Sequence, residues 1–272
     1  MGLLRLRWVQ IFGIGVIFFI ISNLTLSFTN DVLYFPTVMT IGAFLIPVTF
    51  VAYFYQQEKL FDRSVHAGSI LPTLVLCVLF GGLIGTLAAG SLEYVTISSK
   101  SPLTLVWVGP IEEFAKLIVP IIVFIITRNR FRSELDGILF GVATGMAFAA
   151  LETMGYELVA LVSSKGSLVA LDQTILLRGL LSPAGHAAWT GLISATLWRE
   201  RERTGKWFTP LVLGFFLLAA ALHSLWDLTS FSSSLLIVIP SYIVIGGASL
   251  TLLFWRLREA RRASVVAPAL SS

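Results

Sequence analysis

Residues 109–120 read GPIEEFAKLIVP, which would pass for the middle of a membrane-spanning helix except for three charged side chains. Glu112, Glu113 and Lys116 interrupt a run that is otherwise apolar. On insertion scales a charged side chain at mid-bilayer costs about 3 kcal/mol, so these three need partners or a purpose. The surrounding sequence indicates which of the two applies.

The composition is that of a multi-pass membrane protein. Of the 272 residues, 56% are hydrophobic and 12% are charged, and the mean hydropathy is +0.88, whereas soluble domains carry about 25% charged residues. Each membrane crossing takes about 20 apolar residues, so there is room for roughly eight helices and no sizeable soluble domain. Cys77 is the single cysteine, which excludes an internal disulfide framework and a thiolate zinc site.

We predict an all-α membrane protein with about eight transmembrane helices. The apolar runs that define them cover residues 8–28, 34–55, 69–92, 103–126, 137–162, 175–198, 208–228 and 232–255. The first run is expected to be an uncleaved helix, because it is too long for a signal peptide and lacks a small-residue cleavage site. Residues 1–255 would form a single polytopic membrane domain, and residues 256–272 a basic cytoplasmic tail that is frayed or disordered.

Basic residues alternate between the loops and set the expected orientation. Fifteen of the 19 Lys and Arg residues precede the first helix or follow the second, fourth, sixth and eighth. They are Arg5, Arg7, Lys59, Arg63, Arg128, Arg130, Arg132, Arg199, Arg201, Arg203, Lys206, Arg256, Arg258, Arg261 and Arg262. Lys100, Lys165 and Arg178 lie on the opposite side. By the positive-inside rule both termini are cytoplasmic, and the protein is in the cell membrane. The basic loops then face anionic lipid head groups, and no nucleic-acid partner is needed.

Ionisable side chains within the apolar runs gather on four consecutive helices. They are Glu112, Glu113, Lys116, Glu152, Glu157, His186, His223 and Asp227. Counted from the non-cytoplasmic ends of their helices, Glu112, Glu152 and His186 lie at one depth, about 15 Å at 1.5 Å per residue. His223 and Asp227 lie shallower, near the same face. The sequence therefore predicts a polar cluster that opens toward the outer half of the bilayer.

Helical spacing indicates which of these side chains face one another. Glu112 and Lys116 are four residues apart, as are His223 and Asp227, so each pair shares a helix face. Glu113 is turned about 100° from Glu112, so we expect one of the two to face the cluster and the other to anchor a neighbouring helix. A buried structural ion pair, an interfacial pair or a packing histidine are the simpler interpretations of the same residues.

Other features of the helix over residues 137–162 have structural interpretations. Glu157 lies within a turn or two of the membrane interface, where a structural role is favoured. Gly137, Gly141 and Gly145 of GILFGVATG recur every four residues, a pattern typical of close packing between membrane helices.

The intramembrane polar residues fall into four motifs that resemble those of the PrsW family of prokaryotic intramembrane proteases, which is related to the CAAX prenyl endopeptidases and abortive-infection proteases. The motifs are EExxK (Glu112, Glu113, Lys116), FxxxE (Phe148, Glu152), a mid-membrane histidine in GHAAW (His186) and HxxxD (His223, Asp227). Each motif is weak alone, but all four in order, within roughly residues 105–230, are specific. The CAAX-type relatives have a longer EExxxR motif and a histidine in an FxxxH motif. Lys116 at the shorter spacing of EExxK, and Glu152 in place of that histidine, point to the PrsW branch.

This resemblance implies hydrolysis of a peptide bond of a membrane-anchored protein, by helices over about residues 103–228. The expected catalytic residues are Glu112, Glu113, Glu152, His186 and His223, with Lys116, Asp227 and Phe148 in support. Members of the family are linked to the cleavage of membrane-anchored regulators such as anti-sigma factors. The expected function is therefore regulated proteolysis near the extracytoplasmic half of the bilayer.

Two mechanisms remain open from the sequence. In the first, the three glutamates form a coupled set and one of them takes a proton from water. His223, oriented by Asp227, then hydrogen-bonds the oxyanion or the leaving group, and no metal is needed. In the second, Glu152, His186 and His223 hold a single zinc ion, with a glutamate of the adjacent pair as base and Asp227 as the partner of His223. The absence of an HExxH-like pair of ligands favours the first mechanism.

Other classes of function also stay open. A proton-coupled transporter or channel uses intramembrane carboxylates and histidines as a relay, although such a relay forms a ladder across the bilayer and not a cluster at one depth. A CAAX-type endopeptidase, or a catalytically silent scaffold that binds membrane segments, are further alternatives. The substrate, the cleavage site and the oligomeric state do not follow from the sequence.

Overall fold

The structure is a computed structural model, and it describes residues 6–61, 70–97, 102–127, 129–230 and 232–266. Within these ranges the chain forms nine α-helices and three 3-10 turns and no strand, which confirms the predicted all-α fold. The helices are α1 (Arg7–Thr29), α2 (Phe35–Phe61), α3 (Ile70–Thr96), α4 (Val108–Thr127), α5 (Glu134–Ser163), α6 (Leu168–Leu181), α7 (His186–Thr204), α8 (Pro210–Ser230) and α9 (Leu235–Val266).

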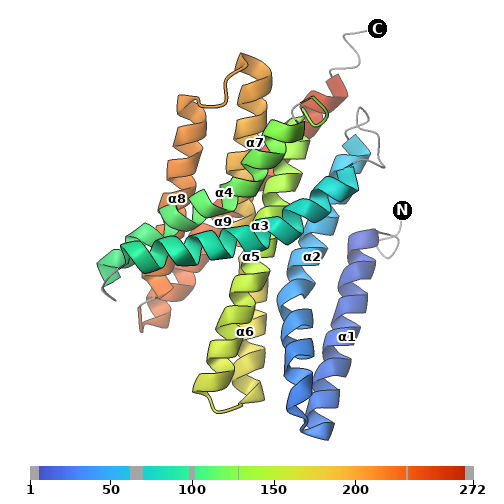
Figure 1. Cartoon of the computed structure of the whole chain (residues 1–272), viewed down its shortest axis with the longest axis vertical. Coiled ribbons are helices and arrows are strands. Elements are labelled where there is room, and N and C mark those ends of the chain that lie inside the picture. The colour runs from blue at the N-terminus through green and yellow to red at the C-terminus, as the bar shows by residue number, and fades with distance from the viewer. Residues whose placement is uncertain (1–5, 62–69, 98–101, 128, 231, 267–272) are drawn as a thin grey trace.

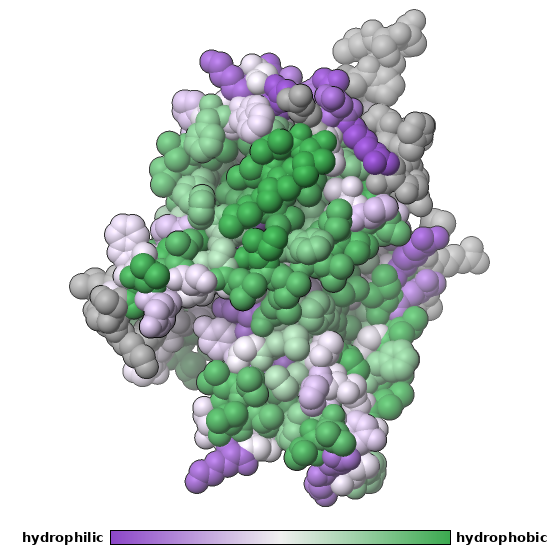
Figure 2. All heavy atoms as spheres, in the orientation of Figure 1, coloured by the Kyte–Doolittle hydropathy of each residue, from purple (hydrophilic) through white to green (hydrophobic). Residues whose placement is uncertain are grey.

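Helix α5 lies at the centre of the bundle, where it packs against α2, α3, α6 and α7. Figure 1 shows α1 and α2 side by side at one edge, α3 crossing the bundle obliquely, and α8 toward the other edge. Apolar side chains cover the middle of the face shown in Figure 2, and hydrophilic residues gather at its upper and lower ends. This surface is that of a bundle embedded in lipid, because its apolar middle would contact acyl chains and its hydrophilic ends would contact water.

Close packing of α5 on α7 depends on the predicted glycine face. A Cβ added to Gly137 or Gly141 would come within 3.0 Å of Ser194 on α7. A Cβ added to Gly145 would overlap the backbone carbonyl of His186 in the same way. The glycines therefore let the two helix backbones approach closely, and the close-packing interpretation of GILFGVATG is confirmed.

Six of the nine described α-helices are long and apolar enough to cross a membrane, namely α1, α2, α3, α5, α8 and α9. Helix α4 carries three charged residues, α6 has only 14 residues, and α7 ends in the charged run RERER. The chain is a multi-pass membrane protein, but the lengths and compositions of its described helices do not confirm the predicted count of eight spans.

The helix that we predicted over residues 175–198 is in fact two helices. Helix α6 ends at Leu181, a 3-10 turn covers Ser182–Ala184, and α7 begins at His186. Pro183 has no backbone N–H to donate, and Gly185 has the non-helical angles φ −104° and ψ −92°. The break is buried, and it places His186 in the first turn of a helix instead of at the middle of one.

The predicted tail also differs from expectation. Helix α9 continues to Val266, so the segment from Arg256 that we expected to be frayed is helical over residues 256–266. The side chain of Arg256 is 2% exposed and pairs with Glu259 on the same helix. Its ion pair with Glu134 of α5 fixes this end of α9 to the bundle. Four of the basic residues in the orientation argument lie outside the described residues, namely Arg5, Arg63, Lys100 and Arg128.

Candidate functional site

Four helices bring the intramembrane polar side chains into one cluster. Helix α4 supplies Glu112, Glu113 and Lys116, α5 supplies Glu152, α7 supplies His186, and α8 supplies His223 and Asp227. The start of α4 is held directly against α8, because a Cβ on Gly109 would come within 3.0 Å of Ala220 and Ser224. The Ser224 hydroxyl also donates a hydrogen bond to the carbonyl of Val106 (2.8 Å).

Glu113 is the anchoring member of the carboxylate pair. It is 0% exposed, and its Oε1 accepts a hydrogen bond from Nζ of Lys116 (2.8 Å) and lies 2.9 Å from Nδ1 of His223. Its Oε2 accepts a hydrogen bond from the hydroxyl of Thr190 on α7 (3.3 Å). Glu112 is the member that faces the cluster, since its Oε2 lies 3.5 Å from Nε2 of His223 and is paired on its own helix only with Lys116.

Lys116 is fully buried between the two carboxylates. Its Nζ lies 3.0 Å from Oε2 of Glu112 and 2.8 Å from Oε1 of Glu113. The same ammonium group lies 4.3 Å from the ring centroid of Phe148, a cation–π contact. The Phe148 ring is 5.7 Å from the His186 ring. Phe148 thus fills the space between the ammonium group and the imidazole.

His186 is held by a carboxylate on one side only. Its Nε2 lies 3.2 Å from Oε2 of Glu152, whereas its Nδ1 is buried without a hydrogen-bond partner. The same Glu152 oxygen lies 2.8 Å from Nη2 of Arg178 on α6. Arg178 also donates a hydrogen bond from Nε to Thr153 (3.3 Å) and stacks over the ring of Tyr156 (3.9 Å). Arg178 therefore fixes the carboxylate that contacts His186.

His223 is oriented mainly by Glu113 and not, as we expected, by Asp227. The 2.9 Å contact of its Nδ1 with Glu113 is the shorter one, and Oδ2 of Asp227 lies 3.6 Å from its Nε2. Trp189 stacks on the imidazole with ring centroids 4.5 Å apart, and its indole N–H donates to the hydroxyl of Ser249 (2.9 Å). The ring of His223 is thus held from its edge and from its face.

The arrangement fits a metal ion. Glu112, His186 and His223 each offer a ligand atom, and these atoms lie within 4.8 Å of one another. In each imidazole the second nitrogen faces a glutamate, Glu113 or Glu152, as is typical of metal-binding histidines. Two histidines with one carboxylate form a donor set of catalytic zinc sites. The group differs from the set we expected in its carboxylate, because Glu112 stands where Glu152 was predicted.

Three further ionisable residues differ from the sequence interpretation. Arg178 was counted as a loop charge, although its long side chain reaches back to Glu152. Glu93 of α3 lies one residue beyond a predicted helix, and its Oε1 is buried without a hydrogen-bond partner. Glu157, which we placed near the interface, is fully buried, and neither of its carboxylate oxygens has a hydrogen-bond partner.

The fold and the cluster together define a multi-pass membrane protein with a group of ionisable residues enclosed between its helices. Residues 70–254 match the family described as PrsW family intramembrane metalloprotease, and the chain belongs to that family. The predicted resemblance to the PrsW family is confirmed, and the protein is a membrane-embedded protease. No curated protein and no solved structure matches the chain.

Proposed function

We propose that the chain is a zinc-dependent endopeptidase that hydrolyses a peptide bond of a membrane-anchored protein within the bilayer. Glu112, His186 and His223 would hold the zinc ion. The observation that carries this proposal is the convergence of three ligand atoms within 4.8 Å, two of them on imidazoles whose other nitrogen faces a glutamate. This supports the second of the two mechanisms left open by the sequence.

The metal-free mechanism has less support because Glu113, one of its three candidate bases, is already occupied. Both oxygens of Glu113 take part in contacts, with Lys116 and His223 on one side and Thr190 on the other. A carboxylate with these partners is an anchor and has little basicity left for water. Glu112 would then be the remaining base of the pair.

In the zinc-dependent mechanism the residues of the chain have separate tasks. When bound, zinc supplies Lewis acidity, which polarises the scissile carbonyl and activates water near neutral pH. Glu113 and Glu152 hold the two imidazoles in place. Asp227 is the group placed to move protons, because its Oδ2 is buried without a hydrogen-bond partner beside His223 while a quarter of its side chain is exposed. It would take a proton from water and return it to the leaving amine, so that water is added across the C–N bond.

We propose that the protein lies in the cell membrane with both termini in the cytoplasm and the site in the extracytoplasmic half of the bilayer. The distribution of basic loops supports this orientation. In Figure 1, α1 begins at its upper end, and α9 ends near the top of the picture. The substrate would be a membrane-anchored regulator, with an anti-sigma factor as the example that the family resemblance suggests.

The test separates ligands from the proton carrier by measuring two quantities for each variant. Cells express the unmutated protein, Glu112→Gln, His186→Ala, Asp227→Asn or Glu157→Gln at matched levels, and the fragments shed from single-pass membrane proteins are identified by mass spectrometry. Each protein is also purified and its zinc content measured. Glu157→Gln is the matched control, because it removes a buried carboxylate from outside the cluster.

Cells that express the unmutated protein or Glu157→Gln should release fragments of single-pass proteins, and both purified proteins should contain one zinc per chain. Glu112→Gln and His186→Ala should lose the zinc and the release of fragments. Asp227→Asn should keep the zinc and lose the release of fragments. Shedding that is the same for all five proteins would overturn the protease assignment for this cluster. Shedding by purified protein that contains no zinc and survives chelation would restore the glutamate mechanism.

A further inference from the structure

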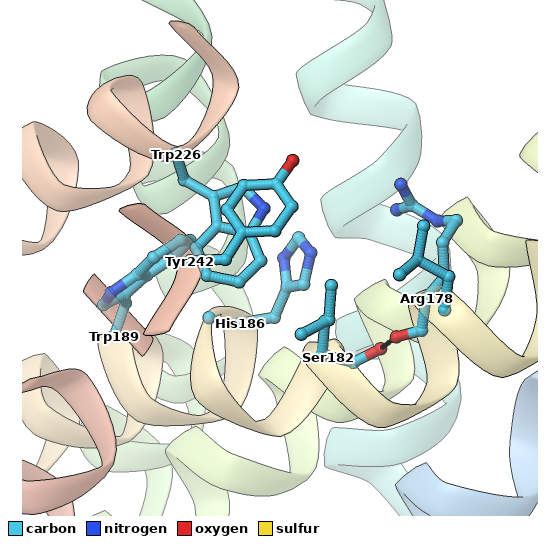
Figure 3. A pocket seen from close by; sticks show the side chains of 9 residues that line it. Arg178, Ser182, His186, Trp189, Trp226 and Tyr242 are labelled. Atoms are coloured by element: carbon cyan, nitrogen blue, oxygen red, sulfur yellow. Dashed lines mark hydrogen bonds between the residues drawn. The ribbon is translucent and has the colours of Figure 1, made fainter. Parts of the chain in front are cut away.

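A pocket of about 90 Å³ lies directly beside the candidate metal centre. Figure 3 shows His186 pointing into it, with the rings of Trp226 and Tyr242 on one side and Arg178 on the other. Trp189 and Ser182 also line the pocket. His186 belongs to both the pocket and the ligand group, so whatever fills the pocket lies next to the reacting centre.

The two sides of the pocket come from helices that are packed on different neighbours. Arg178 and Leu177 are on α6, which packs against α5 and α2. Trp226 is on α8 and Tyr242 on α9, and these helices pack against each other and against α7. The Trp226 and Tyr242 rings stack at 4.1 Å, so this side is a rigid aromatic wall. The space between α6 and α9 is consequently an opening in the bundle, which we call the lateral entrance.

The lateral entrance is bordered by apolar side chains that face lipid. Leu177 and Leu180 of α6 are 60% and 69% exposed, and Ile239 and Ile243 of α9 are 53% and 68% exposed. Exposed aliphatic side chains on a membrane helix contact acyl chains or another membrane segment. The opening is therefore reached from the bilayer and not from water.

The floor of the pocket is the break between α6 and α7. Irregular backbone at membrane depth is tolerated where it is buried in protein or lines a cavity. A substrate segment that is to be hydrolysed must itself be locally unwound, and its freed backbone groups then need polar partners. Ser182, Tyr242 and Arg178 line the pocket. The Ser182 hydroxyl donates to the carbonyl of Arg178, so its oxygen can still accept a hydrogen bond from a freed backbone N–H.

We propose that a transmembrane segment of the substrate enters sideways through the lateral entrance, and that this pocket takes the side chain next to the scissile bond. This inference rests on the proposed protease function and specifies how its substrate is selected. The stacked rings of Trp226 and Tyr242 form the wall that limits which side chain the pocket accepts. The rest of the segment lies along the lipid-facing sides of α6 and α9.

The test closes the lateral entrance without removing any residue of the metal centre. The only native cysteine, Cys77, is buried, so a pair of new cysteines can be joined selectively. Leu177→Cys with Tyr242→Cys spans the entrance. Phe12→Cys with Leu176→Cys spans an apolar pocket on another side of α6 and is the matched control. Membranes that contain each variant are treated with a flexible bifunctional maleimide, and shed fragments are compared before and after treatment.

Joining the entrance pair should reduce shedding by 10-fold or more relative to the same variant before treatment, and joining the control pair should leave shedding unchanged. Undiminished shedding after complete joining of the entrance pair would overturn the entrance. No shedding by the unmutated protein would instead overturn the proposed function, and this inference with it. Tyr242→Ala should widen the pocket and move cleavage toward residues with larger side chains, and an unchanged residue preference would overturn the assigned selectivity.

Discussion

Oε2 of Glu152 lies 3.2 Å from Nε2 of His186 and 2.8 Å from the guanidinium of Arg178. This contact leaves Nδ1 of His186 free on the side of Glu112 and His223. Glu152 is thus placed to hold a ligand and not to be one.

The Glu152→Gln variant should weaken zinc binding without abolishing it. Loss of a carboxylate that orients a metal-binding histidine typically lowers metal affinity 10- to 100-fold, because the imidazole is no longer fixed or as basic. Competition with a zinc chelator measures the affinity, and excess zinc should restore shedding. Glu157→Gln on the same helix is the control. An affinity equal to that of the unmutated protein would show that Glu152 does not orient the site.

The Glu113→Gln variant should destabilise the bundle strongly. Removing one partner of a buried ion pair costs about 3–5 kcal/mol, because it leaves the other charge poorly compensated. Here Lys116 would keep only Glu112. Adding Lys116→Met should recover part of the loss, which thermal unfolding in detergent can measure. Purely additive losses in the double variant would mean that the two side chains do not interact.

The Gly145→Ala variant should separate α5 from α7. The new methyl group would overlap the carbonyl of His186, and overpacking of this kind costs about 1–3 kcal/mol. The shift also moves His186, so shedding should fall together with the melting temperature. Gly155→Ala on the same helix meets nothing within 4 Å and should leave both quantities unchanged. Equal melting temperatures for the two variants would contradict the close packing.

Cysteine labelling can establish how the segment 168–204 crosses the membrane. If α6 and α7 together cross once, the loops before and after them lie on opposite sides. A cysteine at Lys165 should then react with an impermeant maleimide added outside intact cells, and one at Lys206 should react only after lysis. Both positions are exposed in the structure. Labelling of both from outside would show that α6 and α7 form a re-entrant pair.

Much of the site could be predicted because charged residues inside apolar runs are conspicuous. The grouping of α4, α5, α7 and α8 followed from depth and spacing alone. Which glutamate anchors and which faces the cluster could not be predicted, because this depends on Thr190 and His223 on other helices. Arg178 was read as a loop charge because sequence position does not show where a long side chain reaches.

The break between α6 and α7 was missed for a different reason. The run over residues 175–198 is apolar throughout, and hydropathy does not respond to backbone geometry. The signal was the tetrapeptide SPAG at residues 182–185, since Pro and Gly both interrupt helices. Weighting that signal above the hydropathy would have placed His186 at a helix start.

Two of the four helices that carry the cluster, α4 and α7, fall short of the apolar length expected of an independent span. Lys116 pairs with both glutamates within α4, whereas the other partners of Glu113, Thr190 and His223, lie on α7 and α8. We therefore expect insertion of α4 into the membrane to be coupled to assembly of the cluster. A substitution that prevents the cluster from forming should then lower the amount of protein in the membrane together with its activity.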